Sequence, residues 1–440
     1  MDFIPRTLGG TLLQVVEQYP VVYLTGPRQS GKTTLAQHVL PGYRYLSLEQ
    51  PRTRDEAIND PERFLRRVAG GGPGAKGAPG VILDEVQRAP ELFSYLQGFV
   101  DARRGGPFVL TGSQNFLLSQ AITQSLAGRV AVLELLPFSL AELARRDALK
   151  PRDYESSLAH AALPRRPSGL DLDELLFTGL LPPIHDRGLP PTTWLDGYVT
   201  TYVERDVRQV AAVGDLADFQ RFMGLCAGRV GQLLNHAALA EDAGIDRKTA
   251  RRWLSVLQAS YVVTLLSPHY VNFSRRLIKT PKLYFLDTGL ACNLLGITAA
   301  EQLRTHPLRG AIFENLVISE LLKAWRHNGE RPRLYFWRDR TGREVDALLD
   351  FPGARVPLEA KAGETLSRGF FKGLGFYRAL QEEARAVGGG VVAAADGAEA
   401  GEANGGGAAA ADRPFGVLAY GGDDSGDHWG HTVRPWWAVS

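Results

Sequence analysis

The stretch LTGPRQSGKTTL, residues 24–35, carries the most specific chemistry in the sequence. It fits the pattern G-x-x-x-x-G-K-[S/T] between an apolar run and a helical run, as a phosphate-binding loop requires. The glycines let the backbone wrap around phosphate oxygens, Lys32 reaches the β- and γ-phosphates, and Thr33 offers a hydroxyl to Mg²⁺. We therefore predict that ATP and Mg²⁺ bind at Gly26, Pro27, Arg28, Gln29, Ser30, Gly31, Lys32, Thr33 and Thr34.

The run GVILDEV adds an acidic pair to the same chemistry. Asp84 and Glu85 end an apolar strand, where Asp84 can hold Mg²⁺ and Glu85 can orient the attacking water. The alternative is an acidic strand end that caps the next helix.

Two weaker candidates follow. Ser113 ends the run FVLTGS and is positioned to reach the γ-phosphate from an adjacent strand, with a polar turn as the alternative. Arg129, in LAGRV, is a candidate arginine finger that acts within the chain or across a subunit boundary. Its alternative is a solvated or ion-paired arginine.

Basic residues gather in the middle of the chain. The segment NHAALAEDAGIDRKTARRWLSVL predicts two helices separated at Gly244, with Asp246 as the N-cap of the second. This is helix-turn-helix spacing, and the β-like runs YVVTLLSPHY and PKLYFLD would form a wing. We predict DNA binding by Arg247, Lys248, Arg251 and Arg252. The alternative is a fold used for packing or protein contact, with solvated arginines.

Near the end of the chain, Asp346 lies in EVDALL and the next strand-like run ends in Glu359-x-Lys361. Strand alternation puts Glu359 and Lys361 on one face. Asp346 and Glu359 can share a divalent metal while Lys361 stabilises charge, and Glu314 lies on the preceding helical run. These residues predict phosphodiester hydrolysis, with an inactive salt-bridge network as the alternative. We expect the nearby aromatic group FFKGLGFY to pack a terminal helix, and the alternative is a base-stacking platform.

Composition narrows these possibilities. The formal net charge of +2 gives no overall footprint for nucleic acid, so DNA binding has to rest on a local basic patch. Cys226 and Cys292 are far apart and lack partners at ligand spacing, which argues against disulfides and zinc. No apolar run reaches the roughly 18 residues of a membrane span, so we expect a cytoplasmic protein without a membrane partner.

The stretches YLTGPRQSGKTTL, VILDEVQRAPELFSYLQ and LAGRVAVLELLPFSLAEL resemble the AAA-type ATP-binding proteins with a C-terminal DUF4143 region. The stretches TYVERDV, RRWLSVL and KLYFLDTGLACNLLG resemble the C-terminal region of that family. The Asp346, Glu359 and Lys361 pattern resembles the PD-(D/E)xK nuclease superfamily. The first resemblance implies a Walker B pair at Asp84 and Glu85, a sensor-like Ser113, and Arg129 in the family's GR element.

These observations predict an α/β protein of three domains. A P-loop parallel-sheet ATPase domain is expected over residues 1–165, a helical and winged-helix domain over 166–300, and a restriction-endonuclease-like α/β domain over 301–440 with a Gly/Ala-rich insertion near 388–411. The expected function is an ATPase that couples nucleotide state to DNA binding, with metal-dependent DNA cleavage. The alternative is a nucleotide-dependent switch that binds a protein partner, or DNA, without cleavage. Self-association is left open.

Overall fold

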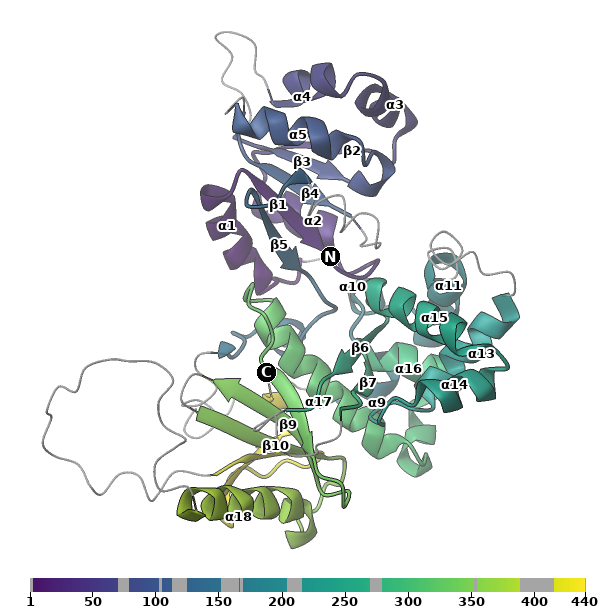
Figure 1. Ribbon diagram of the computed structural model, residues 1–440, viewed down its shortest axis with the longest axis vertical. Coiled ribbons are helices and arrows are strands. Elements are labelled where there is room, and N and C mark those ends of the chain that lie inside the picture. The colour runs from purple at the N-terminus through teal and green to yellow at the C-terminus, as the bar shows by residue number, and fades with distance from the viewer. Residues whose placement is uncertain are drawn as a thin grey trace, which may run out of the picture.

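Three regions follow one another along the chain in the computed structural model (Figure 1). A parallel-sheet region lies at the top of the view, and a helical middle region and a C-terminal mixed-sheet region lie below it. The structure describes residues 3–69, 79–102, 105–112, 125–151, 166, 169–203, 216–269, 279–351, 354–387 and 415–439.

The first region is built on a five-stranded sheet in the order β2-β3-β4-β1-β5, with every pairing parallel. This confirms the predicted parallel sheet and the three strands expected from the apolar runs. The order also places β4 between β1, which leads into the phosphate loop, and β3, which ends in the acidic pair. The strands are β1 (Val21–Thr25), β2 (Arg44–Ser47), β3 (Val81–Asp84), β4 (Phe108–Thr111) and β5 (Val130–Glu134).

Alternation along β1 divides the core of this region in two. Val21 and Tyr23 pack on one face, and Val22 and Leu24 pack on the other. Apolar residues of α4 and α5 cover the first face, and those of α1 and α2 cover the second. The helices are α1 (Leu8–Gln18), α2 (Lys32–Val39), α3 (Pro51–Asn59), α4 (Pro61–Ala69), α5 (Leu92–Asp101) and the short α7 (Leu140–Leu143).

The middle region is mainly helical, as expected, and has a small antiparallel pair of strands before its last α-helix. Gly244 takes a left-handed conformation at the end of α14, and the Asp246 carboxylate accepts from the amides of Lys248 and Thr249, which confirms the predicted break and N-cap. The elements are α9 (Leu172–Thr178), α10 (Pro182–Arg187), α11 (Pro191–Tyr198), α13 (Leu216–Ala227), α14 (His236–Ala243), α15 (Arg247–Ala259), β6 (Val263–Leu266), β7 (Lys282–Phe285) and α16 (Thr288–Leu294).

The C-terminal region holds a mixed six-stranded sheet in the order β12-β13-β11-β10-β9-β8. Strands β8, β9 and β10 are antiparallel neighbours, whereas β10, β11 and β13 run parallel. Its elements are α17 (Arg309–Arg326), β8 (Leu334–Arg338), β9 (Glu344–Phe351), β10 (Ala354–Lys361), α18 (Lys372–Val387), β11 (Val417–Tyr420), β12 (Gly426–His428) and β13 (His431–Pro435).

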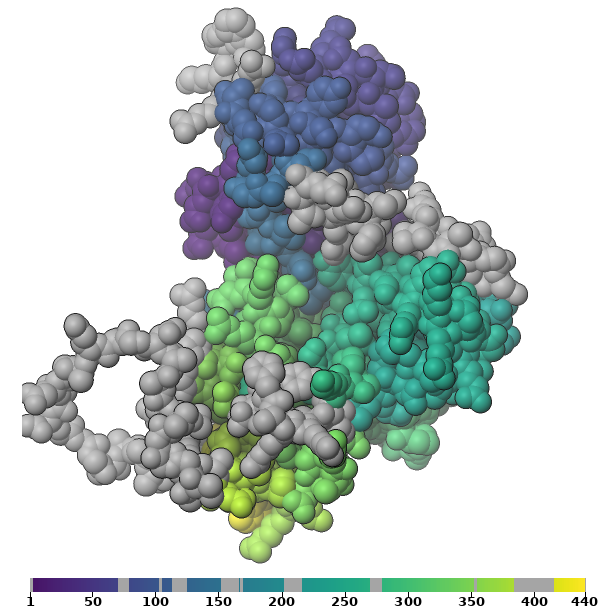
Figure 2. Space-filling model, viewed as in Figure 1, coloured from purple at the N-terminus to yellow at the C-terminus, as the bar shows by residue number. Residues whose placement is uncertain are grey.

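The two helices of this region lie on opposite faces of the sheet. Buried residues of α17 share one core with the inner face of β9 and β10 and with the helical middle region. Residues of α18 pack with the other face. Consistent with the shared core, the space-filling view shows the middle and C-terminal regions as one continuous mass (Figure 2). Among the described helices, none is long and apolar enough to cross a membrane.

Candidate functional site

The phosphate loop joins β1 to α2 and needs glycine at its two ends. Gly26 has φ 142°, and a Cβ there would lie 2.1 Å from the Leu135 carbonyl oxygen. Gly31 has φ 89° and is the N-cap of α2. Both conformations strongly favour glycine, so the loop geometry selects the residues that the motif requires.

Polar groups converge behind this loop. The Lys32 ammonium donates to the carbonyls of Gly26 at 3.1 Å and Pro27 at 2.6 Å, so it lies over the loop. The Thr33 hydroxyl donates to Asp84 Oδ1 at 2.9 Å. The two side chains expected to hold Mg²⁺ are therefore adjacent, although one comes from helix α2 and the other from strand β3, and their oxygens are the ligands that this cation prefers.

Two residues that the sequence interpretation missed complete the surroundings of Asp84. Tyr45, on β2, donates to Asp84 Oδ2 at 2.9 Å, and Thr111, at the end of β4, donates to Oδ1. Each hydroxyl fixes one carboxylate oxygen, so Asp84 is held by hydrogen bonds from both neighbouring strands. The contact between Thr111 and Asp84 follows from the strand order, because that order brings the end of β4 next to the end of β3.

Three other residues were predicted to act at this site: Glu85, Ser113 and Arg129. Glu85 is partly exposed next to Asp84, has a left-handed φ of 59°, and accepts a hydrogen bond from Gln87. Such a conformation is costly for a non-glycine residue and is typical of functional sites. Ser113 lies outside the described residues.

Arg129 lies next to the amino ends of the parallel strands, whereas the phosphate loop follows the carboxyl end of β1. It precedes Val130, whose register partner is Val21 at the start of β1. Its guanidinium forms a two-pronged ion pair with Asp101. Since β1 rises by about 3.3 Å per residue, the fold does not bring Arg129 to the loop of its own chain. A role across a subunit boundary stays a prediction.

A buried ion network joins the phosphate loop to the C-terminal region. Arg6 donates to the Ser30 carbonyl at 2.7 Å and to Glu142 Oε2 at 3.0 Å. His327, at the end of α17, places Nδ1 at 3.2 Å from Glu142 Oε1. Burial alone would raise the pKa of Glu142, but the charges of Arg6 and His327 lower it well below its usual range. No sequence motif marked these residues.

The four cations predicted to bind DNA share the exposed face of the α15 start. They are Arg247, Lys248, Arg251 and Arg252, and within the described residues none of them forms an ion pair. The buried residues of the helix, Trp253 and Leu257 among them, face the core instead. The cations are therefore free to meet a partner in solvent.

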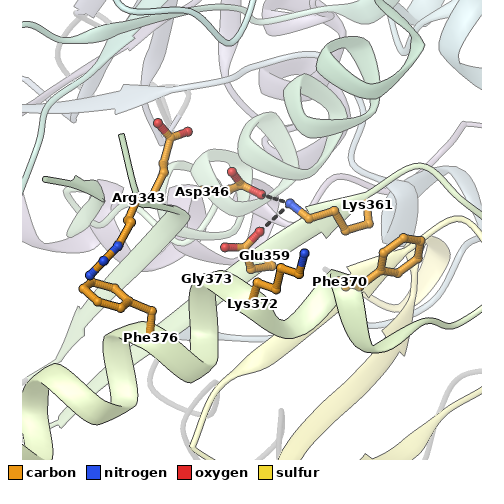
Figure 3. Close-up of a pocket in the computed structure, with 10 residues that line it drawn as sticks. Arg343, Asp346, Glu359, Lys361, Phe370, Lys372, Gly373 and Phe376 are labelled. Carbon is orange, nitrogen blue, oxygen red and sulfur yellow. Dashed lines mark hydrogen bonds and ion pairs between the residues drawn. The ribbon is translucent and has the colours of Figure 1, made fainter. Parts of the chain in front are cut away.

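Asp346, Glu359 and Lys361 of the C-terminal region meet in one pocket of about 430 Å³ (Figure 3). Lys361 donates to Asp346 Oδ2 at 3.1 Å and to Glu359, and the Ala360 amide donates to Asp346 Oδ2 at 2.9 Å. Burial and then the charge of Asp346 raise the pKa of Glu359 to about 9. A proton must therefore leave before both carboxylates bind a metal together.

Glu314 approaches the same cluster from α17 but is already neutralised. Lys282, the first residue of β7, places its ammonium 2.8 Å from Glu314 Oε1 and forms a second ion pair with Glu344. Oxygens of Glu314, Glu344 and Asp346 lie within 4.8 Å of one another. Burial and then Asp346 raise the pKa of Glu314 to about 7. Sequence interpretation missed both Glu344, which begins β9, and Lys282, which comes from the middle region.

Family comparisons divide the chain much as the structure does. An AAA domain model matches residues 18–144, and a domain of unknown function, DUF4143, matches residues 309–400. The middle region, which the sequence interpretation attached to the DUF4143 region, matches a separate domain of unknown function, DUF8612, over residues 169–301.

Similar proteins occur in distant organisms. The uncharacterized protein Rv2008c of Mycobacterium tuberculosis is 33% identical over 366 residues, which cover 82% of this chain and 75% of that protein. The uncharacterized protein MJ1544 of Methanocaldococcus jannaschii is 24% identical over 75% of this chain and 71% of that protein.

Among solved structures, a Walker-type ATPase of Pyrococcus abyssi is 17% identical with a TM-score of 0.41, over 67% of this chain and 96% of that one. At that TM-score the overall likeness supports no argument, and the fold rests on the AAA match and the strand order. The chain belongs to the family of the mycobacterial protein, and it is a P-loop ATPase in which an AAA domain precedes a C-terminal DUF4143 region.

Proposed function

We propose that this protein uses ATP to control its binding to DNA and that its C-terminal pocket cleaves phosphodiester bonds with a divalent metal. The observation that carries the proposal is the convergence of Asp346, Glu359 and Lys361, from two adjacent strands, in one open pocket. The phosphate loop and the AAA match support nucleotide-dependent ATPase activity. The exposed cations of α15 and the following strand pair support the winged-helix interpretation and DNA binding.

Asp346 and Glu359 would hold the metal, which would activate water for attack on phosphorus. The Lys361 ammonium lies between the two carboxylates in the structure and is positioned to stabilise the extra charge on the phosphate in the transition state. The partly buried position of Lys361 strengthens this electrostatic contribution, because water screens it less.

The buried network supports communication between the two sites. Arg6 contacts the phosphate loop through the Ser30 carbonyl, and Glu142 connects Arg6 to His327 at the end of α17. The same helix carries Glu314 near its other end. In addition, Tyr198 at the end of α11 donates to the Arg28 carbonyl at 3.4 Å. These contacts would therefore transmit a movement of the loop on nucleotide binding to the middle region and to the C-terminal region.

A second candidate function is a nucleotide-dependent switch that binds a protein partner, or DNA, without cleavage. Lys282 favours it, because its buried ammonium forms ion pairs with both Glu314 and Glu344. A carboxylate cluster that carries its own cations is compatible with a purely structural role.

DNA nicking by the purified protein distinguishes the two. With Mg²⁺ or Mn²⁺ and ATP, we expect nicking of supercoiled DNA, which Asp346→Ala and Lys361→Ala each abolish while ATP hydrolysis stays nearly intact. Asp427→Ala, at an exposed position of the same sheet, is the control and should nick normally. Wild-type protein that nicks no DNA with either metal, with or without ATP, would leave the non-cleaving switch.

A further inference from the structure

The pocket around Asp346 and Glu359 also has a rim that the proposed cleavage chemistry does not use. Phe370 lies on one side of the carboxylates, and Phe376 with Arg343 lies on the other (Figure 3). The Arg343 guanidinium lies over the Phe376 ring, 4.0 Å from its centroid. Lys372, the first residue of α18, is exposed between the two sides.

Phe370 and Phe376 are less buried than the other two aromatic residues of the same segment. Phe371 and Tyr377, in the same segment, are buried and pack α18 against the sheet, as the sequence predicted. Phe370 and Phe376 are only partly buried and line the pocket. Phe370 and Phe376 pack against the same core, as predicted, and their rings also line the pocket.

The close fit of α18 keeps the rim next to the carboxylates. Gly373 follows Lys372, and a Cβ there would lie 1.9 Å from Glu359 Oε1. Any larger residue would push the start of α18 away from the carboxylates. The rim and the carboxylates therefore form one site.

We propose that this pocket binds DNA with an unpaired nucleotide next to the phosphate, as in a single strand or an overhang. Arg343 and Lys372 attract the backbone phosphates, while the Phe370 ring and the Arg343 plane, supported by Phe376, stack on bases. Bases inside a duplex are already stacked on each other and cannot reach these planes. The pocket volume of about 430 Å³ suits one nucleotide rather than a double helix. This inference rests on the proposed DNA function.

Binding of fluorescent oligonucleotides to the full chain, in EDTA so that no cleavage occurs, tests the proposal. The probes are a blunt duplex, the same duplex with an unpaired overhang, and a single strand of equal length. Wild-type protein should bind the overhang and the single strand at least about five-fold more tightly than the blunt duplex, since stacking on one base contributes about 1–3 kcal/mol.

Phe370→Ala and Arg343→Ala should each remove that preference, because each removes a plane on which an unpaired base would stack. Phe370→Trp should keep it, because a larger ring still stacks. Trp429→Ala and Arg378→Ala, an exposed aromatic and an exposed cation outside the pocket, are the matched controls and should bind like wild type.

The experiment distinguishes failure of this inference from failure of the proposed DNA function. Equal affinity for all three probes, or a preference that survives both pocket variants, overturns this inference while the DNA function stands. If no probe binds, the proposed function fails and this inference fails with it. Equal unfolding temperatures of the variants would show that any lost preference is not a loss of the fold.

Discussion

At the residue scale, we expect Lys32 and Glu85 to have separable tasks in ATP use. Lys32→Ala should abolish ATP binding and hydrolysis, because the phosphates lose the ammonium that lies over the loop. Glu85→Gln should retain ATP but hydrolyse it at least about 100-fold more slowly, because only the water-orienting carboxylate is lost. Separate measurements of nucleotide binding and of phosphate release for each variant check these two predictions. Loss of binding in Glu85→Gln with an intact fold would mean that the two roles are reversed.

Lys282 is the residue on which the carboxylate cluster depends most for its charge balance. Its side chain is 2% exposed, so Lys282→Met leaves Glu314 without its cation and Glu344 with Arg338 alone, and should cost about 3 kcal/mol of stability. The loss should be smaller at pH 6 than at pH 8, because the raised pKa of Glu314, about 7, lets that group become neutral at the lower pH. Urea unfolding at both pH values measures it, with the exposed Lys150→Met as control. Equal stability of the variant and wild type would contradict the charge balance.

Residue patterns predicted the phosphate loop, the acidic pair and the pocket carboxylates because each lies in a short, locally defined motif. Lys282 and Arg6 could not be found in this way. Each acts through a partner more than 30 residues away along the chain, and only tertiary packing brings the pairs together.

At the scale of elements, α7 and the end of α17 are joined through Glu142. The carboxylate is ionised in the folded protein at a pH where it would be protonated in the unfolded chain, so it stabilises the fold above its ordinary pKa of about 4.3. Glu142→Gln should therefore cost about 3 kcal/mol at pH 7, and the difference from wild type should shrink as the pH falls below about 4. Urea unfolding over this pH range checks it, with the exposed Glu301→Gln as control. A difference that does not change with pH would show that the charge is not responsible.

The start of α15 presents cations whose contribution to DNA binding can be counted. Arg251→Ala combined with Arg252→Ala should weaken binding and reduce the slope of log affinity against log salt by about one for each lost phosphate contact. Arg63→Ala with Arg66→Ala, on the exposed face of α4, should leave the slope unchanged. An unaltered slope in the α15 variant would favour the protein-partner interpretation of this helix.

Element prediction succeeded where periodicity and turn residues agreed. The apolar strands of both sheets and the helix break at Gly244 follow from local pattern. Strand order does not, because it depends on which faces pack together. The same limit applies to Arg129. The family motif suggested a catalytic role, but the register of β5 puts this residue at the amino ends of the strands, away from the phosphate loop of its own chain.

At the scale of the whole molecule, the shared core makes the middle and C-terminal regions one body, and buried polar contacts attach that body to the phosphate loop. The predicted domain boundaries at 165 and 300 stay predictions. A nucleotide that shifts the loop must therefore act on the body that carries both proposed DNA-binding surfaces. If nucleotide state changes the affinity for DNA, as we propose, then DNA changes the affinity for the nucleotide by the same factor.

The affinity of the Glu85→Gln protein for DNA, measured by fluorescence anisotropy without nucleotide, with ADP and with ATP and Mg²⁺, tests this coupling most directly. The account predicts a difference of at least about five-fold between the ATP and nucleotide-free states, which disappears when Lys32→Ala prevents ATP from binding. The same DNA affinity in all three states, in a protein shown to bind ATP, would contradict it.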